Sequence, residues 1–177
     1  FTIESWVYLN SSAKFPIMGV WNSSTSSANW YLFFDGTNLL FKYYNTSNGS
    51  NTLSVAWTPL TSQWVHICVD YVHSANTIRM YVNGSMVVKS TSLSSAFRSS
   101  TTQPLRIGNI VNDASYTLNG FLDDIRITKG VARYASDAGF SVPTTAYPNS
   151  ATDTIGTAVT QQVLLGATSS DPNSRVT

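Results

Sequence analysis

Residues 64–84 decide the fold class, and they read WVHICVDYVHSANTIRMYVNG. Apolar side chains occupy every second position of residues 65–71 and again of residues 78–82. A period of two is typical of β-strands, and Asn83-Gly84 is a strong signal for the tight turn of a hairpin. The stretch therefore predicts two strands, with residues 86–89 returning as the partner of the second.

Short apolar or alternating runs recur along the rest of the chain, with turn signals between them. The further predicted strands cover residues 1–9, 16–20, 30–35, 39–44, 105–108 and 121–128, and residues 45–51 are predicted as loop. The usual surface helix formers Lys and Glu are scarce, and no strand–helix–strand pattern competes. The sequence thus favours an all-β fold, a two-sheet antiparallel jelly-roll sandwich with a C-terminal extended arm.

The composition excludes several classes of protein. Charged residues make up 11% of the 177 residues, against about 25% in a typical domain, and the net charge is +1. Without a basic run there is no electrostatic footprint for nucleic acid or an anionic membrane, and the apolar runs are too short for membrane insertion. The single cysteine, Cys68, cannot form an internal disulfide, and a buried, inert thiol is its expected state.

A change in composition near residue 149 divides the chain. Residues 1–148 are predicted as the sandwich, and residues 149–177 as an arm or linker rich in Ser, Thr and Ala. Within the arm, residues 158–165 could form one strand. A single strand cannot bury its own apolar face, so this segment would need the sandwich or another chain as its partner.

Four segments in order carry a family resemblance: Phe1–Val7, Trp64–Val69, Met80–Gly84 and Gly120–Ile127. Together they resemble the laminin-G-like branch of the concanavalin A-like lectin/glucanase superfamily. Residues 128–134 resemble the form of this domain that is common in bacteriophage and bacterial surface proteins. The resemblance implies a sandwich of two curved antiparallel sheets. Family members usually carry strands before the first segment, so the sandwich is expected to lack them, and residues 158–165 are a candidate to fill the missing edge.

The residues argue against an enzyme. Glucanases of this superfamily resemble one another in a strand with the pattern Glu-x-Asp-x-x-Glu, which places paired carboxylates across the scissile bond. Here Glu4 is the only glutamate, and Asp123 and Asp124 leave opposite faces of one strand. Glu4, Arg79, Asp124 and Arg126 fall on the less apolar faces of their strands, which predicts a solvated, salt-bridged sheet surface.

A sugar-binding site makes fewer demands on the sequence than a glycosidase active site, because it needs only aromatic rings and a few hydrogen-bonding groups. The candidate ligand-binding residues lie in or beside polar loops, and they are Trp21, Trp30, Asn109, Asn112 and Tyr116. The alternative is that these aromatic residues fill the core and the Asn residues make turns.

Two aspartates are candidate metal ligands. The resemblance implies calcium as an accessory ion, and Asp113 is the most plausible loop donor. Asp123 shares a strand face with Ile125 and Ile127, where a lone carboxylate would be costly. The alternative for Asp123 is a structural role, in which Arg106 or backbone amides satisfy it.

The resulting hypothesis is a non-catalytic adhesion module that recognises host polysaccharide. The resemblance implies a bacteriophage virion component, such as a tail fibre, tail-associated or capsid-decorating protein, at the virion surface or extracellular. It would belong to an oligomeric assembly with other virion or surface-protein subunits. The alternative is a purely structural module that holds neighbouring subunits and binds no sugar. A patch that gathers exposed Trp or Tyr with convergent Asn or Asp would distinguish the first from the second.

Overall fold

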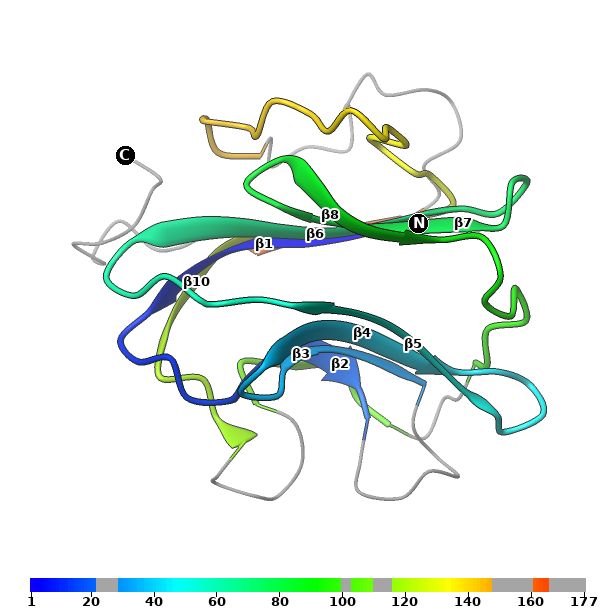
Figure 1. Cartoon of the computed structure of the whole chain (residues 1–177), viewed down its shortest axis with the longest axis horizontal. Helices are drawn as coiled ribbons and strands as arrows, with labels where there is room; N and C mark the ends of the chain where they lie inside the picture. Colours follow the sequence, from blue (N-terminus) through cyan, green and yellow to red (C-terminus); the bar gives the residue numbers. More distant parts are fainter. Residues whose placement is uncertain (22–28, 100–102, 110–115, 148–160, 166–177) are drawn as a thin grey trace. The chain divides into compact units, whose positions relative to one another are not determined.

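The computed structural model describes residues 1–21, 29–99, 103–109 and 116–147, together with the backbone of residues 161–165 (Figure 1). The described elements are strands, and they form one six-stranded and one five-stranded sheet. Every strand pair with a described register is antiparallel. The prediction of an all-β fold with two antiparallel sheets is therefore confirmed. The described residues include no helix of the length and hydropathy needed to cross a bilayer.

The chain divides into two compact units, each of which holds one sheet. The first unit comprises residues 1–8, 64–89 and 122–177, and the second comprises residues 9–63 and 90–121.

The six-stranded sheet of the first unit has the strand order β11-β10-β1-β6-β7-β8. Its strands are β1 (Thr2–Leu9), β6 (Trp64–Val72), β7 (Thr77–Val82), β8 (Ser85–Ser90), β10 (Gly120–Lys129) and β11 (Gln161–Leu165). The turn between β7 and β8 places Asn83 at φ 48° and Gly84 at φ 77°. Both residues are left-handed, as a two-residue hairpin of type I′ requires, so the predicted turn is confirmed.

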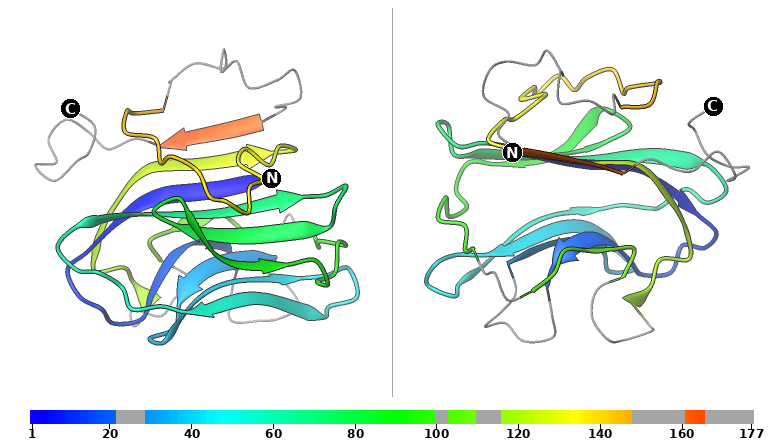
Figure 2. Two further views of the ribbon diagram at one scale, coloured as in Figure 1. Left: turned by 45° about the horizontal axis from the view of Figure 1, so that its top comes forward. Right: turned by 180° about the vertical axis from the view of Figure 1, so that it is seen from behind.

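Strand β11 comes from the predicted arm and extends the sheet at the edge of β10. Its register pairs Ile125 with Leu165 and Lys129 with Gln161. Figure 2 shows the two strands side by side, β11 in orange and β10 in yellow. This pairing agrees with the hypothesis that part of residues 158–165 fills a sheet edge.

The five-stranded sheet of the second unit has the order β5-β4-β3-β2-β9. Its strands are β2 (Phe15–Val20), β3 (Trp30–Phe34), β4 (Asn38–Tyr44), β5 (Ser50–Ala56) and β9 (Arg106–Ile107). One face of this sheet is core, with Leu32, Phe34 and Phe41 almost fully buried. The other face carries Tyr31, Phe33 and Lys42 in alternation with these residues.

Strand β5 was not predicted, since residues 45–51 read as loop and the polar run SNTLSVA gives little periodicity. In this strand only Leu53 is buried. An edge strand that pairs on one side needs few apolar residues, because backbone hydrogen bonds to β4 supply much of its stability.

The prediction that the less apolar face of β1, which carries Glu4, is solvated is wrong. Thr2 and Glu4 are both fully buried, although they lie on the polar face of β1. The reason is that residues 130–147, drawn in yellow in Figure 1, run over this face of the six-stranded sheet. We call residues 130–147 the cover segment. The Asp70 carboxylate fixes its start by accepting hydrogen bonds from the backbone N–H groups of Tyr134 and Ala135.

Candidate functional site

Five rings gather on the non-core side of the five-stranded sheet, and we call them the aromatic face. They are Trp21, Tyr31, Phe33, Tyr44 and Tyr116. The ring centroids of Tyr31 lie 5.1 Å from Trp21 and 6.3 Å from Phe33, and Phe33 lies 5.7 Å from Tyr116. Phe33 and Tyr44 are buried and form the floor, whereas Trp21, Tyr31 and Tyr116 are partly exposed. The face therefore offers ring surface to a ligand on a rigid strand support.

Hydrogen-bonding groups and cations surround these rings. Burial, together with nearby Tyr44 and Tyr116, raises the pKa of Tyr31 to about 12, so its hydroxyl stays a neutral donor. Asn109 donates from Nδ2 to Thr117 Oγ1 at 3.0 Å, and its Oδ1 accepts no hydrogen bond from any described residue. The ammonium of Lys14 lies 4.5 Å from the ring centroid of Tyr116. Rings combined with such groups can hold a ligand that has one apolar and one hydroxylic surface.

Gly19 on β2 allows the aromatic face to form. It pairs with Tyr31 on one side and with Arg106 on the other. A Cβ atom on Gly19 would lie 2.7 Å from Tyr31 Cβ and 2.8 Å from the backbone oxygen of Trp30. Since real contacts are longer, a side chain here would push β2 and β3 apart beneath the Tyr31 ring.

We expect Gly19→Ala to lower the free energy of unfolding by about 1–3 kcal/mol, because its new methyl group clashes with backbone rather than with a flexible side chain. Urea denaturation measures the loss. Gly49→Ala is the matched control, since a Cβ there would meet the Asn45 side-chain amide, which can move. Equal stability of the two variants would show that β2 tolerates the methyl group.

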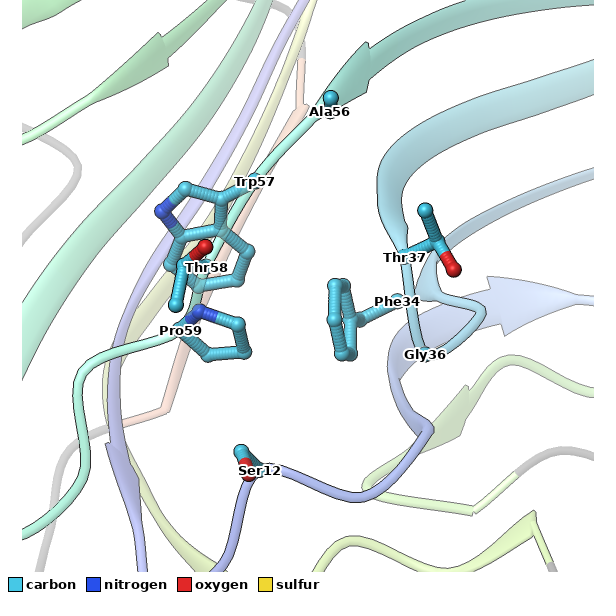
Figure 3. A pocket seen from close by; sticks show the side chains of 8 residues that line it. All are labelled: Ser12, Phe34, Gly36, Thr37, Ala56, Trp57, Thr58 and Pro59. Atoms are coloured by element: carbon cyan, nitrogen blue, oxygen red, sulfur yellow. The ribbon is translucent and has the colours of Figure 1, made fainter.

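A pocket, which we call the rim pocket, lies at one end of the same sheet (Figure 3). Its volume is about 450 Å³, and it is lined by Ser12, Phe34, Gly36, Thr37, Ala56, Trp57, Thr58 and Pro59. In Figure 3 Trp57 and Pro59 form one wall, and Phe34 and Thr37 lie opposite. The Trp57 ring packs edge-on against Phe34 at 5.6 Å and against Phe15 at 6.5 Å. Through these contacts Trp57 caps the core of the unit, while its ring remains partly exposed.

A buried ionic cluster centred on Glu4 lies under the cover segment in the first unit. Arg126 donates to Glu4 Oε1 from Nε at 2.8 Å and pairs through Nη2 at 2.7 Å. The hydroxyls of Tyr134 and Tyr147 donate to Oε2 at 2.7 and 3.0 Å, and His66 Nε2 lies 3.3 Å away. The Arg126 guanidinium also stacks 3.6 Å from the ring centroid of Tyr147. The cluster thus ties three strands to the cover segment.

The electrostatics of this cluster fit a structural role. Burial alone would raise the pKa of Glu4, but the His66 hydrogen bond, the Arg126 charge and the Tyr134 hydroxyl outweigh it and lower the pKa to about 2. At neutral pH Glu4 is therefore an ionised acceptor, enclosed away from solvent, with no proton to donate. Burial likewise raises the pKa of the Cys68 thiol well above its usual value, so the expectation of an inert thiol agrees with the structure.

The prediction of a solvated sheet surface is wrong for three of its four residues. Glu4, Asp124 and Arg126 are 0%, 3% and 5% exposed. Only Arg79 is paired near solvent, with its Nε 2.6 Å from Oδ1 of the exposed Asp137. The polar face of the sheet is covered because residues 130–147 fold back over it. The alternation patterns of the strands do not predict this cover.

The structure brings together three of the predicted ligand-binding residues. Trp21 and Tyr116 belong to the aromatic face, and Asn109 lies beside Tyr116 through the bridge between Asn109 and Thr117. Trp30 is separated from them, because it shares the core side of β3 with Leu32 and its ring lies 6.0 Å from Phe41. Asn112 lies outside the described residues.

The metal candidates do not converge on a site in the part of the chain that the structure describes. Asp123 is 1% exposed, and its Oδ1 accepts a hydrogen bond from the N–H of Asp124 at 2.7 Å, as in the structural alternative. No group of three or more His, Cys, Asp or Glu side chains that could hold a metal ion occurs among the described residues. Asp113 lies outside those residues, so the calcium prediction rests on the resemblance.

Sequence reasoning missed the centre of the aromatic face. Tyr31 and Phe33 alternate with Trp30, Leu32 and Phe34, so β3 is apolar on both faces. A strand that is apolar on both faces is typical of a fully buried strand, so the sequence pattern does not show that Tyr31 is partly exposed. A signal that could have found it is the pair of cations Lys14 and Lys42, the nearest positive charges in the sequence on either side of this strand.

The family is established by comparison with known proteins. Residues 1–137 match the family model Laminin_G_3, described as the concanavalin A-like lectin/glucanases superfamily. The chain belongs to this superfamily. Its fold class is accordingly the concanavalin A-like jelly-roll sandwich, as the sequence predicted. A search of curated proteins finds no match.

Solved structures with the superfamily fold are similar to this domain. One is a candidate carbohydrate-binding protein from Bacteroides ovatus, with a TM-score of 0.60 and 20% identity, over 75% of this chain and 37% of that chain. Another is the Ruminococcus gnavus IT-sialidase CBM40 bound to α2,3-sialyllactose, with a TM-score of 0.52 and 14% identity, over 68% of each chain. This sequence therefore spans well under half the length of the Bacteroides protein. At these identities the likeness establishes the fold alone.

Proposed function

We propose that this domain is a non-catalytic glycan-binding module whose ligand lies against the aromatic face. The observation that carries the proposal is the gathering of Trp21, Tyr31 and Tyr116, all partly exposed, with the ammonium of Lys14 against the Tyr116 ring. The rings can stack on the apolar side of a pyranose, and the hydroxyl and amide groups can bind its hydroxyls. Carbohydrate binding by proteins of the same fold supports the proposal.

The proposed function also includes a location for the domain. Residues 128–134 resemble the form of the domain that is common in bacteriophage and bacterial surface proteins. This resemblance supports display at a virion surface or in the extracellular space, as part of a tail fibre, a tail-associated protein or a capsid decoration. There the module would adhere to host polysaccharide while other subunits of an oligomeric assembly hold it in place.

Binding of the purified chain to a panel of bacterial and algal polysaccharides tests the function. We expect Trp21→Ala and Tyr116→Ala each to weaken binding about tenfold, or about 1.4 kcal/mol, because each removes one stacking ring. Val87→Ala is the control, since this exposed residue lies on β8 of the other unit. Running the panel with calcium and with a chelator tests the implied ion at the same time.

Two outcomes would contradict the proposal. If the folded chain binds no polysaccharide under either condition, the alternative of a purely structural module is favoured. If it binds but Trp57→Ala abolishes binding while Trp21→Ala and Tyr116→Ala do not, the glycan occupies the rim pocket instead.

A further inference from the structure

Charges are distributed differently in the two units. In the first unit three of the five described cations contact acids: Arg126 contacts Glu4, while Arg79 and Lys89 both lie 2.6 Å from carboxylate oxygens of Asp137. Of the other two, Arg133 donates from Nε to Thr128 Oγ1, and Lys129 is exposed. Opposite charges that pair in this way leave little net field outside the protein.

In the second unit the cations gather around aromatic rings. Lys42 is the strand partner of Tyr31, and its ammonium lies 5.6 Å from the ring centroid of Tyr44. The guanidinium of Arg98 lies 5.1 Å from the same ring. Together with Lys14 over Tyr116, three cations therefore contact the aromatic face.

A fourth cation, Arg106, lies on the same face of the sheet as Tyr31, because both residues pair with Gly19. Strand-paired residues point to the same side of a sheet, and Gly19 pairs with both Tyr31 and Arg106. Arg106 Nε is buried and has no hydrogen-bond partner among the described residues. All four cations of the second unit thus lie on or beside one face.

Acids do not balance these cations in the described part of the unit. The sequence places two acids there, Asp35 and Asp113, and Asp113 is outside the described residues. The Asp35 carboxylate instead accepts hydrogen bonds from the N–H groups of Thr37 and Asn38, at 2.9 and 2.7 Å. Lys14, Lys42 and Arg106 form no ion pair with any described residue. Cation–π contacts orient such groups but leave their charge in place.

We propose that the aromatic face selects acidic glycans, polysaccharides whose sugars carry carboxylate or sulfate groups. This inference rests on the proposed function and names its ligand class. A sugar ring would stack on Trp21 and Tyr31, while its anionic group meets Lys42 and Arg98 at the Tyr44 end. Guanidinium and ammonium groups bind both kinds of oxyanion through charge-assisted hydrogen bonds. Nucleic-acid binding needs many cations that contact phosphates along the strand. The net charge of +1 and the absence of a basic run therefore favour binding of an acidic glycan at one small cationic face.

Matched pairs of polymers test the inference with the whole chain. Polygalacturonate against its methyl ester tests carboxylate, and dextran sulfate against dextran tests sulfate. We expect the charged member of at least one pair to bind about tenfold more tightly, and the preference to fade as salt rises from about 0.05 to about 0.5 M. The pair that shows the preference identifies the anionic group.

Variants locate the preference on the face. Lys42→Met keeps the length and apolar stem of the side chain but removes its charge, so we expect the ratio of charged to neutral polymer binding to fall by most of its excess over one. Arg98→Gln should act in the same direction. Lys129→Met is the control, because Lys129 is exposed and lies on β10 in the other unit.

The outcomes separate this inference from the proposed function. Equal binding of charged and neutral polymers, unchanged in Lys42→Met, would overturn the acidic preference and leave a glycan-binding module. Failure to bind any polymer would overturn both. Tighter binding of single-stranded poly-U than of either acidic polymer would assign the face to nucleic acid and overturn the inference.

Discussion

Glu4→Ala is expected to lower the free energy of unfolding by about 3–5 kcal/mol, which is the range for breaking a buried ion pair from one side. Arg126, 5% exposed, would remain buried without its counter-ion. The hydroxyls of Tyr134 and Tyr147 would also lose the acceptor that fixes the cover segment. Urea denaturation, with the slope compared between variants, measures the loss.

Two further variants make this result specific. Asp137→Asn removes an exposed carboxylate that pairs with Arg79 and Lys89, and we expect a much smaller loss because solvent screens this pair. The double variant Glu4→Leu/Arg126→Met should be more stable than Glu4→Ala, since no unpaired charge remains buried. If Glu4→Ala does not fold, Glu4→Gln replaces it. A loss no larger than that of Asp137→Asn would contradict a structural role for Glu4.

The strands could be predicted because their signal is local. Residues 64–84 carry the alternation and the Asn-Gly turn of a hairpin, and the structure places β6, β7 and β8 there. Strand β5 was not predicted, because an edge strand with one buried residue, Leu53, has almost no hydrophobic pattern in its sequence. Period-two patterns report which face is buried, so a strand that buries little is invisible to them.

The clusters that matter most could not be predicted, because each depends on contacts between distant segments. Glu4 reads as a surface residue until residues 134 and 147 are known to lie above it, more than a hundred positions away in the sequence. Loop position suggested Trp21 and Tyr116, since both flank polar segments, and the structure places both rings on the aromatic face. The same criterion chose Trp30, which the strand turns toward the core side.

The two units illustrate two uses of the same residue types. Tyr134 and Tyr147 donate their hydroxyls to a buried carboxylate, so these two hydroxyls hold the cover segment on the six-stranded sheet and are not offered to a ligand. Among the described residues, the cations Lys42 and Lys14 lie beside Tyr31 and Tyr116, and both tyrosines are partly exposed. Composition does not distinguish these tyrosines, and the placement of charge around them separates the stabilising Glu4 cluster from the proposed binding face.

The stability of the protein is expected to fall by about 3 kcal/mol through Glu4 as the pH drops from about 5 to about 2. The pKa of Glu4 is about 2 in the folded chain against an ordinary value of 4.5. Between these values the unfolded chain binds the proton and the folded chain does not, so acid favours unfolding; the stabilisation is complete above pH 4.5 and disappears as the pH approaches 2.

Asp70 acts in the opposite direction over a higher range of pH. Burial raises its pKa above the ordinary 3.8, despite hydrogen bonds from the N–H groups of Ala135 and Tyr134. Folded Asp70 therefore takes up a proton before the unfolded chain does, and this offsets part of the loss near the start of the acid range. The net curve should consequently be shallow at first and steeper below the ordinary pKa of Glu4.

Glu4→Gln isolates the contribution of Glu4 to this curve. It keeps an acceptor of similar shape beneath the cover segment but has no proton to gain, so its stability should change much less between about pH 4.5 and about pH 2. Denaturant unfolding of both proteins across this range gives the two slopes, and parallel curves would refute the assignment. Because Tyr134 and Tyr147 report on the cover segment, their fluorescence should change along with the loss of stability if protonation of Glu4 loosens that segment from the sheet.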